Sequence, residues 1–173
     1  MHCYCIYCTT QKCNYVAEAL TAMGIGRAIT PKILQRKWIG GKAYEEIHEY
    51  LPGYVFLYTE TPPEDFSLIR TMTDVHRLLG NKDDRYELCG ADRAFAEMLY
   101  ASDGTIGFFP AYEECDRVRL DSSLLEGFEG VITRLDRAKK RAEIEFDFDG
   151  KKQRVWCGIE LIASGRKDDV RKK

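Results

Sequence analysis

The sequence predicts a small α/β sandwich domain followed by a small all-β barrel. Two observations support this prediction: strand and helix periodicities alternate along the first part of the chain, whereas only period-two patterns follow it. Between them, 102–107 is small, polar and glycine-bearing, which suits a linker. With 173 residues, the chain is long enough for two small domains. We expect these domains at 1–102 and 113–173, joined by a linker at 103–112.

The first domain opens with a strand at 3–8 and an amphipathic helix. The strand is apolar and rich in strand-forming residues. Thr9 and Thr10 offer a hydroxyl N-cap, and Gly24 stands where a helix commonly ends in a left-handed residue. An apolar stripe recurs between them at helical spacing, made of Cys13, Val16, Ala17, Leu20 and Met23.

The rest of the first domain is predicted to contain three strands and two short helices. We expect the strands at 29–34, 54–58 and 75–79, with Pro31 confining the first to a sheet edge and a polar loop containing Gly40 and Gly41 ending it. One helix begins near Pro63, and Asp92 caps the other. Their inward-facing residues are Phe66, Ile69 and Met72 in the first helix, and Phe95, Met98 and Leu99 in the second. The order β-α-β-β-α-β-α is typical of a small α/β sandwich.

The second domain is defined by a hairpin with a readable register. Residues 142–148 alternate between apolar and charged, and Asp149-Gly150 is a type I′ turn signal before a second strand at 154–159. Shorter alternating runs lie at 117–120 and 131–132. The predicted register pairs Asp147 with Lys152, Glu145 with Arg154, and Ile144 with Val155. Several short strands in so short a segment indicate a small barrel.

The composition describes a folded chain without a dominant charge. Hydrophobic residues make up 45% and charged residues 31%, which excludes disordered and low-complexity classes. The net charge is −2, so any polyanion site must be a local patch. The sequence has neither an apolar run long enough to span a membrane nor the pattern of a signal peptide, so we expect a cytoplasmic protein without a membrane partner.

The number of cysteines near the N-terminus suggests a structural zinc site, but their spacing argues against it. The chain has seven cysteines, an odd number, with Cys3, Cys5, Cys8 and Cys13 crowded at the N-terminus. Strand alternation sends Cys3 and Cys5 to one face and Cys8 to the other. We therefore expect buried, reduced thiols and no metal, with a structural zinc site as the alternative.

No catalytic or cofactor-binding motif occurs in the sequence. The three histidines, His2, His48 and His76, are too far apart to suggest a metal triad, and Lys42 after Gly40-Gly41 lacks the remaining residues of a P-loop. A cysteine nucleophile paired in space with a histidine is the alternative, but burial is the commoner state of a cysteine. We expect a protein that is not an enzyme and needs no cofactor.

Specific motifs resemble the NusG family of transcription elongation factors. Leu51-Pro52-Gly53-Tyr54 resembles the turn that opens the third strand of the family's N-terminal domain. Further matches are the first strand at 3–8, the second helix and fourth strand at 67–71 and 75–80, and a KOW motif at 116–119 and 127–132. The resemblance implies an N-terminal domain with an antiparallel sheet flanked by helices, followed by an SH3-like KOW barrel.

The second half is closer to the specialised LoaP-type antiterminators than to the housekeeping factor. The similar segments are 135–142 and 158–162. Two positions depart from the family: Cys115 replaces the usual glycine, and Ser123-Leu124 replaces the usual Gly-Pro. The resemblance implies a monomeric antitermination factor that promotes read-through of a target operon. The alternatives are a housekeeping elongation factor, whose barrel contacts a ribosomal protein or Rho, and a ribosome-associated KOW module that binds RNA.

The resemblance also implies a surface for each partner. For the RNA polymerase clamp, the implied residues are Tyr7, Leu51, Tyr54 and Phe56. Tyr54 and Phe56 share a strand face, so both are surface residues or, in the alternative, both are core residues. For a hairpin in the nascent leader RNA, the implied residues are Arg134, Arg137, Lys139, Lys140 and Arg141, where the alternative is a solvated basic turn. Strand alternation points Trp156 outward beside these cations, either to stack on an RNA base or, in the alternative, to cover the open end of the barrel. For the non-template DNA strand, they are Ser67, Arg70 and Thr71.

Overall fold

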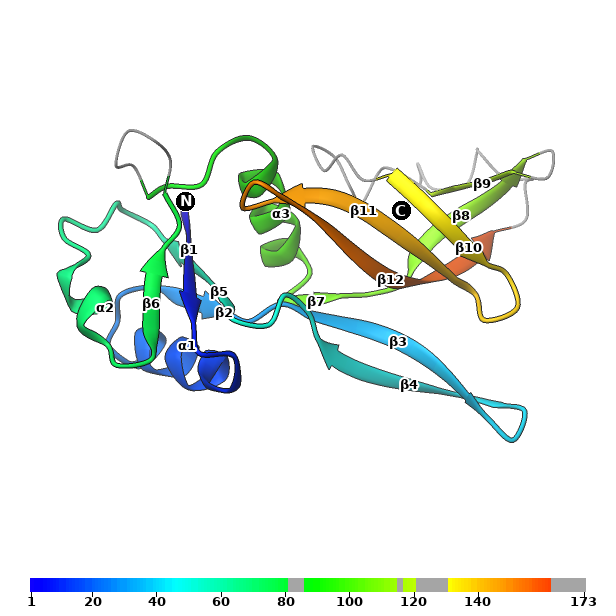
Figure 1. Cartoon of the computed structure of the whole chain (residues 1–173), viewed down its shortest axis with the longest axis horizontal. Helices are drawn as coiled ribbons and strands as arrows, with labels where there is room; N and C mark the ends of the chain where they lie inside the picture. Colours follow the sequence, from blue (N-terminus) through cyan, green and yellow to red (C-terminus); the bar gives the residue numbers. More distant parts are fainter. Residues whose placement is uncertain (81–85, 115–116, 121–130, 163–173) are drawn as a thin grey trace, which may run out of the picture.

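The computed structural model describes residues 1–80, 86–114, 117–120 and 131–162. An N-terminal α/β part and a C-terminal β part lie side by side, and the long hairpin of the C-terminal part reaches onto the N-terminal part (Figure 1). Within the described residues, none of the helices is long and apolar enough to cross a membrane. The sequence positions Cys115, Asp116 and 121–130, which include the two family departures and part of the KOW motif, lie outside the described residues.

The N-terminal sheet has four strands in the order β2-β5-β1-β6. Its strands are β1 (His2–Cys8), β2 (Arg27–Ile29), β5 (Tyr54–Thr59) and β6 (Val75–Leu78). All three pairings are antiparallel. Strand alternation divides the side chains as expected, because Cys3 and Cys5 pack with Phe56 on one face while Ile6 and Cys8 pack on the other.

Helices cover both faces of this sheet. On one face lie α1 (Cys13–Ala22), which follows the short helix η1 (Thr10–Lys12), and α2 (Ser67–Thr71). On the other face lies α3 (Gly90–Ala101), which buries Phe95 and Leu99. The sandwich predicted from the order of elements is therefore confirmed.

Three details of these helices differ from the prediction. Thr9 makes no side-chain capping bond, because its hydroxyl pairs with the His76 ring at 3.2 Å. Met23 lies past the end of α1 and is exposed, so the apolar stripe ends at Leu20. Asp92 stands in the first turn of α3, which Cys89 precedes as the cap residue. The predicted left-handed residue at Gly24 is confirmed by its φ of +71°.

The expected polar loop after residue 34 is instead the tip of a long hairpin. Strands β3 (Lys32–Ile39) and β4 (Lys42–Glu49) pair in register along their whole length. Gly40 and Gly41, with φ of +55° and +78°, form the two-residue turn that type I′ geometry requires. Most of the hairpin is exposed, so no apolar alternation marked it in the sequence. A third strand, β7 (Thr105–Ile106), pairs with the start of β3.

The C-terminal sheet has five strands in the order β10-β11-β12-β8-β9. They are β8 (Phe109–Glu114), β9 (Arg117–Leu120), β10 (Val131–Asp136), β11 (Arg141–Phe148) and β12 (Lys151–Ile162). The predicted register of the main hairpin is confirmed at all three pairs, and Asp149 and Gly150 both have positive φ. The stretch at 103–112 is not irregular, because it holds β7 and the first residues of β8, which pairs in parallel with β12.

Candidate functional site

The four residues implied in polymerase binding lie together at one end of β1 and β5. Tyr7 and Tyr54 are register partners, and their ring centroids are 5.1 Å apart. The turn before β5 brings them together, since Gly53 has a φ of +95° and a Cβ there would lie 2.8 Å from the Tyr7 ring. Leu51 packs from the same turn, and Phe56 follows along the same strand face.

This cluster is covered by the C-terminal part. Tyr54 is 8% exposed and Phe56 is fully buried. The Phe148 ring, at the end of β11, has its centroid 5.4 Å from each of those two rings. It also lies 5.4 Å from the ring of Phe95 in α3. Tyr54 and Phe56 are therefore at the interface between the two parts, and one hydrophobic core, which includes Leu51 and has Tyr7 packed against it, spans both parts.

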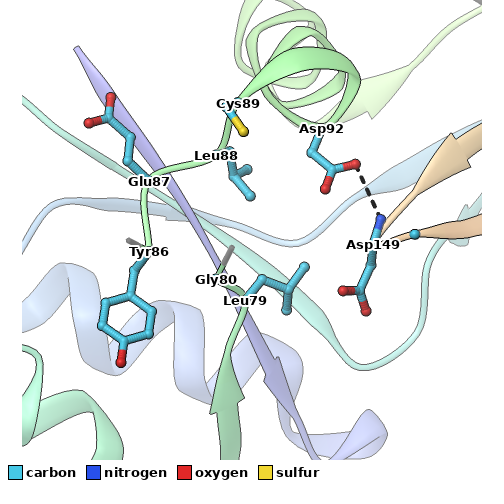
Figure 2. Close-up of a pocket in the computed structure, with 9 residues that line it drawn as sticks. Leu79, Gly80, Tyr86, Glu87, Leu88, Cys89, Asp92 and Asp149 are labelled. Atoms are coloured by element: carbon cyan, nitrogen blue, oxygen red, sulfur yellow. Dashed lines mark hydrogen bonds between the residues drawn. The ribbon is translucent and has the colours of Figure 1, made fainter. Parts of the chain in front are cut away.

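Asp149 fastens the tip of the long hairpin to the N-terminal part. Its carboxylate accepts hydrogen bonds from the Tyr54 hydroxyl at 3.0 Å and from Arg77 at 2.5 Å. Its backbone N–H donates to Asp92 of α3 at 3.2 Å (Figure 2). Burial, together with the bond to Asp149, raises the pKa of Tyr54 to about 12. We call Asp149 and its three partners the latch.

A cavity of about 280 Å³ lies beside the latch. Leu79, Tyr86 and Leu88 line it from the N-terminal part, and Asp92 and Asp149 line the side nearer the hairpin (Figure 2). Burial raises the pKa of Asp92, and the nearby Asp149 carboxylate acts in the same direction. The closed interface therefore places an acidic pair at the edge of a cavity.

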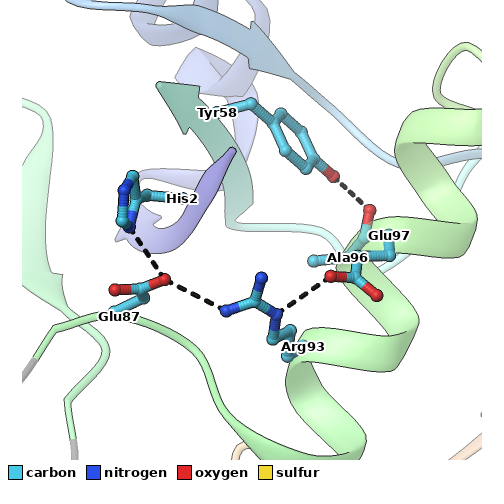
Figure 3. Close-up of polar contacts among 6 residues, drawn as sticks. All are labelled: His2, Tyr58, Glu87, Arg93, Ala96 and Glu97. Atoms are coloured by element: carbon cyan, nitrogen blue, oxygen red, sulfur yellow. Dashed lines mark hydrogen bonds and ion pairs between the residues drawn. The ribbon is translucent and has the colours of Figure 1, made fainter. Parts of the chain in front are cut away.

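The helix beneath the hairpin is itself tied to the N-terminal sheet. Arg93 of α3 contacts Glu87 at 3.1 Å and Glu97 at 2.9 Å, and Glu87 also contacts His2 at 3.0 Å (Figure 3). The Tyr58 hydroxyl donates to the backbone oxygen of Ala96 at 2.7 Å. These bonds attach α3 to the N-terminal sheet, while its Phe95 also packs against Phe146 and Phe148 of the hairpin.

The basic residues implied in RNA binding gather at the connection between β10 and β11. Its turn is ordered by Asp136, which accepts from the Lys139 N–H at 3.0 Å and from Arg141 at 3.2 Å. The Arg134 guanidinium lies 3.7 Å from Glu143. Lys139 and Lys140 are exposed, and neither forms an ion pair with another described residue, although the Asp136 carboxylate interacts electrostatically with Lys139. The two lysines give this end of the barrel a local positive charge.

Trp156 lies beside these cations and is half-buried. Its neighbours Val155, Cys157 and Ile159 are buried, as strand alternation predicts. The Arg141 guanidinium stacks 4.5 Å above the indole ring. One face of the ring is therefore already occupied by Arg141.

The residues implied in DNA contact lie on α2, away from the interface. Ser67 is held by Asp65 through its backbone N–H and its hydroxyl, and Thr71 donates to the Leu68 oxygen at 2.9 Å. Arg70 is exposed, with its guanidinium 4.8 Å from the Tyr86 ring centroid. The three side chains share one short helix but already have partners within it or nearby.

The N-terminal cysteines fall on two faces of the sheet. Cys8 lies on the sheet face that α1 covers, with its sulfur 3.6 Å from that of Cys13, the first residue of α1, whereas Cys3 and Cys5 lie on the α3 face. Burial raises the pKa of Cys8 to about 12, which disfavours the thiolate that zinc needs. Across the described ranges, no three His, Cys, Asp or Glu side chains are placed to share a metal ion.

Sequence reasoning missed the residues that join the two parts. Phe148 and Asp149 were assigned to a barrel face and a turn, and Arg77 received no role. The available signal was the aromatic pair Phe146 and Phe148 next to the turn of the hairpin, whose rings contact Phe95 of α3.

The comparisons with known proteins agree with the fold. A family model described as "Transcription termination factor nusG" matches residues 1–93. No curated protein sequence matches the chain. The solved structure "Domain interaction in Thermotoga maritima NusG" matches with a TM-score of 0.53 and 17% identity, covering 91% of this chain and 93% of that chain. At this identity the match shows a shared fold, and the C-terminal β-rich part is consistent with a KOW domain. The chain therefore belongs to the NusG family, whose members are non-enzymatic transcription factors that bind RNA polymerase.

Proposed function

We propose that this chain is a specialised NusG-family antiterminator of the LoaP type, which binds a hairpin in the nascent leader RNA through its barrel. The supporting observation is the β10–β11 connection, where Lys139 and Lys140 are exposed and form no ion pair within the described part of the chain. Phosphates are the natural partners of such side chains. In a chain with a net charge of −2, a basic patch of this kind is a local feature that favours RNA.

Polymerase binding is proposed to use Tyr7, Leu51, Tyr54 and Phe56. In the closed arrangement Phe148 of the hairpin covers Tyr54 and Phe56, and Phe95 of α3 also packs on Phe56. Aromatic anchors bind a partner only when they are accessible. The hairpin must therefore leave this face before the clamp docks on it. Only the open molecules bind, so the apparent affinity for polymerase is the affinity of the open form multiplied by the fraction of molecules that are open. Ser67, Arg70 and Thr71, exposed on α2, are the proposed contacts to the non-template DNA strand.

The role of RNA in this proposal is to tether the factor to the transcript. A factor held on the nascent RNA has an effective concentration near the polymerase on the order of millimolar. This high local concentration compensates for the small fraction of open molecules, and it arises only on a transcript that carries the RNA hairpin. The factor therefore acts on one operon.

A salt titration tests the RNA assignment. Binding of the full chain to a fluorescein-labelled RNA stem-loop should weaken with salt, and Lys139→Ala with Lys140→Ala should weaken it further. The log-log slope should become shallower by roughly one to two units. The matched control is Lys42→Ala with Lys151→Ala, which removes two exposed lysines elsewhere. If the Lys139→Ala with Lys140→Ala variant binds the RNA with the same affinity and salt slope as wild type, the lysines of this turn are only solvated. The housekeeping elongation factor would then be the better-supported function.

A further inference from the structure

A groove of about 540 Å³ lies between the β3–β4 hairpin and the β10–β11 connection. These two segments, far apart in the sequence, approach each other below the barrel in Figure 1. Arg36, Lys37, Trp38 and Glu46 line one wall, and Lys139 and Arg141 line the other. Each part of the molecule therefore supplies one wall of the same groove.

The charges of the groove favour a polyanion. Arg36, Lys37, Lys139 and Arg141 line it, against the single lining carboxylate of Glu46. Glu45 holds Arg36 at 3.2 Å. The Lys37 side chain is 58% exposed and its ammonium lies 3.4 Å from Glu46, a surface ion pair that contributes little stability and can exchange for a phosphate contact. Lys37 on one wall and Lys139 on the other are thus available to phosphates.

Trp38 gives the groove an aromatic surface. Its side chain is 45% exposed, although a large indole is normally well buried. Stacking of a base on such a ring, with cations beside it, is the usual way in which proteins hold an unpaired nucleotide. The combination of Trp38 and the two lysines therefore fits RNA better than it fits an acidic protein, which offers no base to stack.

Contacts at the base of the groove hold the two walls together. The Gln35 amide donates to the Trp156 backbone oxygen at 3.1 Å. The Arg36 guanidinium lies 4.4 Å from the Phe108 ring centroid. The same ring packs on Gly158 so closely that a Cβ there would lie 2.0 Å from it. The hairpin is thus positioned by direct contact with β12, and the groove is preformed.

We propose that this groove is a single RNA site shared by both parts of the chain, in which Lys37 and Lys139 bind phosphates and Trp38 stacks on a base. The inference rests on the proposed RNA-binding function and extends it to the β3–β4 hairpin.

The test uses the full chain, the same labelled RNA stem-loop and three variants of the β3–β4 hairpin. Lys37→Ala should make the salt slope shallower by somewhat under one unit. Trp38→Ala should weaken binding about fivefold or more. Glu46→Gln should tighten binding because it removes the repulsion in the groove, a gain that misfolding does not produce. Lys42→Ala, at the tip of the same hairpin and outside the groove, should leave affinity and slope unchanged.

The results separate this inference from the function on which it rests. If the three hairpin variants match wild type while the Lys139 and Lys140 variant binds weakly, the shared groove is wrong and the barrel alone binds RNA. If the Lys139 and Lys140 variant also matches wild type, or wild type binds no stem-loop, the proposed RNA-binding function fails. Support requires losses with Lys37→Ala and Trp38→Ala together with the gain from Glu46→Gln.

Discussion

Replacing Phe148 with alanine should open the molecule without unfolding it. The ring is fully buried and contacts Tyr54, Phe56 and Phe95, with all three centroid distances at 5.4 Å. Truncating a buried phenylalanine to alanine costs about 3 to 5 kcal/mol. Because these ring contacts cross the interface, most of that loss falls on the packing between the two parts. A loss of about 3 kcal/mol lowers the ratio of closed to open molecules by roughly a hundredfold.

Two measurements on the full chain detect this change. Small-angle X-ray scattering should give a larger radius of gyration for Phe148→Ala than for wild type. Affinity for purified RNA polymerase should rise, because the fraction of molecules with an accessible sheet face is larger. Lys151→Ala is the control, since Lys151 is the register partner of Phe148 but is exposed.

Specific outcomes would refute this reasoning. An unchanged radius of gyration would mean that Phe148 does not hold the parts together. An open variant with unchanged polymerase affinity would mean that the covered face is not where the clamp docks. Loss of the far-ultraviolet dichroism of folded protein would assign Phe148 to the core of the barrel.

Three further predictions follow from the interface and the cysteines. Tyr54→Ala, made in the Phe148→Ala background so that closure does not mask it, should weaken polymerase binding by about 2 kcal/mol, and a large fall in melting temperature would instead make Tyr54 a core residue. The pKa of Asp92 is raised from its ordinary 3.8, so its contribution to closure is present in acid and lost as pH rises through the raised value. Asp92→Asn, which can still accept the Asp149 N–H, should therefore favour the compact form at neutral pH. It should also make the radius of gyration, measured by small-angle X-ray scattering, depend less on pH in the acid range. Elemental analysis should find less than one zinc per chain, and stoichiometric zinc that disappears when Cys3 and Cys5 become serine would contradict this.

The sequence predicted those features that depend on neighbouring residues. Asp149-Gly150 specifies a two-residue turn, and once that turn is placed, alternation fixes every pair of the hairpin. The division of Cys5 and Cys8 between two faces follows from the same period.

The features that the sequence did not predict depend on long-range packing or carry no apolar pattern. Hairpin β3–β4 is mostly exposed, and its cross-strand charge pairs, such as Arg36 with Glu45, leave no hydrophobic alternation. Phe148 satisfies the alternation of its strand whether its ring lies inside the barrel or against α3. The sequence favoured Asp92 as a helix cap, whereas its side chain accepts a hydrogen bond from Asp149, which lies far away in the sequence.

Transcription of a terminator by purified RNA polymerase tests the central claim most directly. The template carries an intrinsic terminator downstream of a leader that encodes a stem-loop bound by the protein in the titration. Wild-type protein should raise read-through on this template and not on one without the stem-loop, and the Lys139→Ala with Lys140→Ala variant should lose the increase. Equal read-through on both templates, or none on either, would contradict RNA-directed antitermination by this chain.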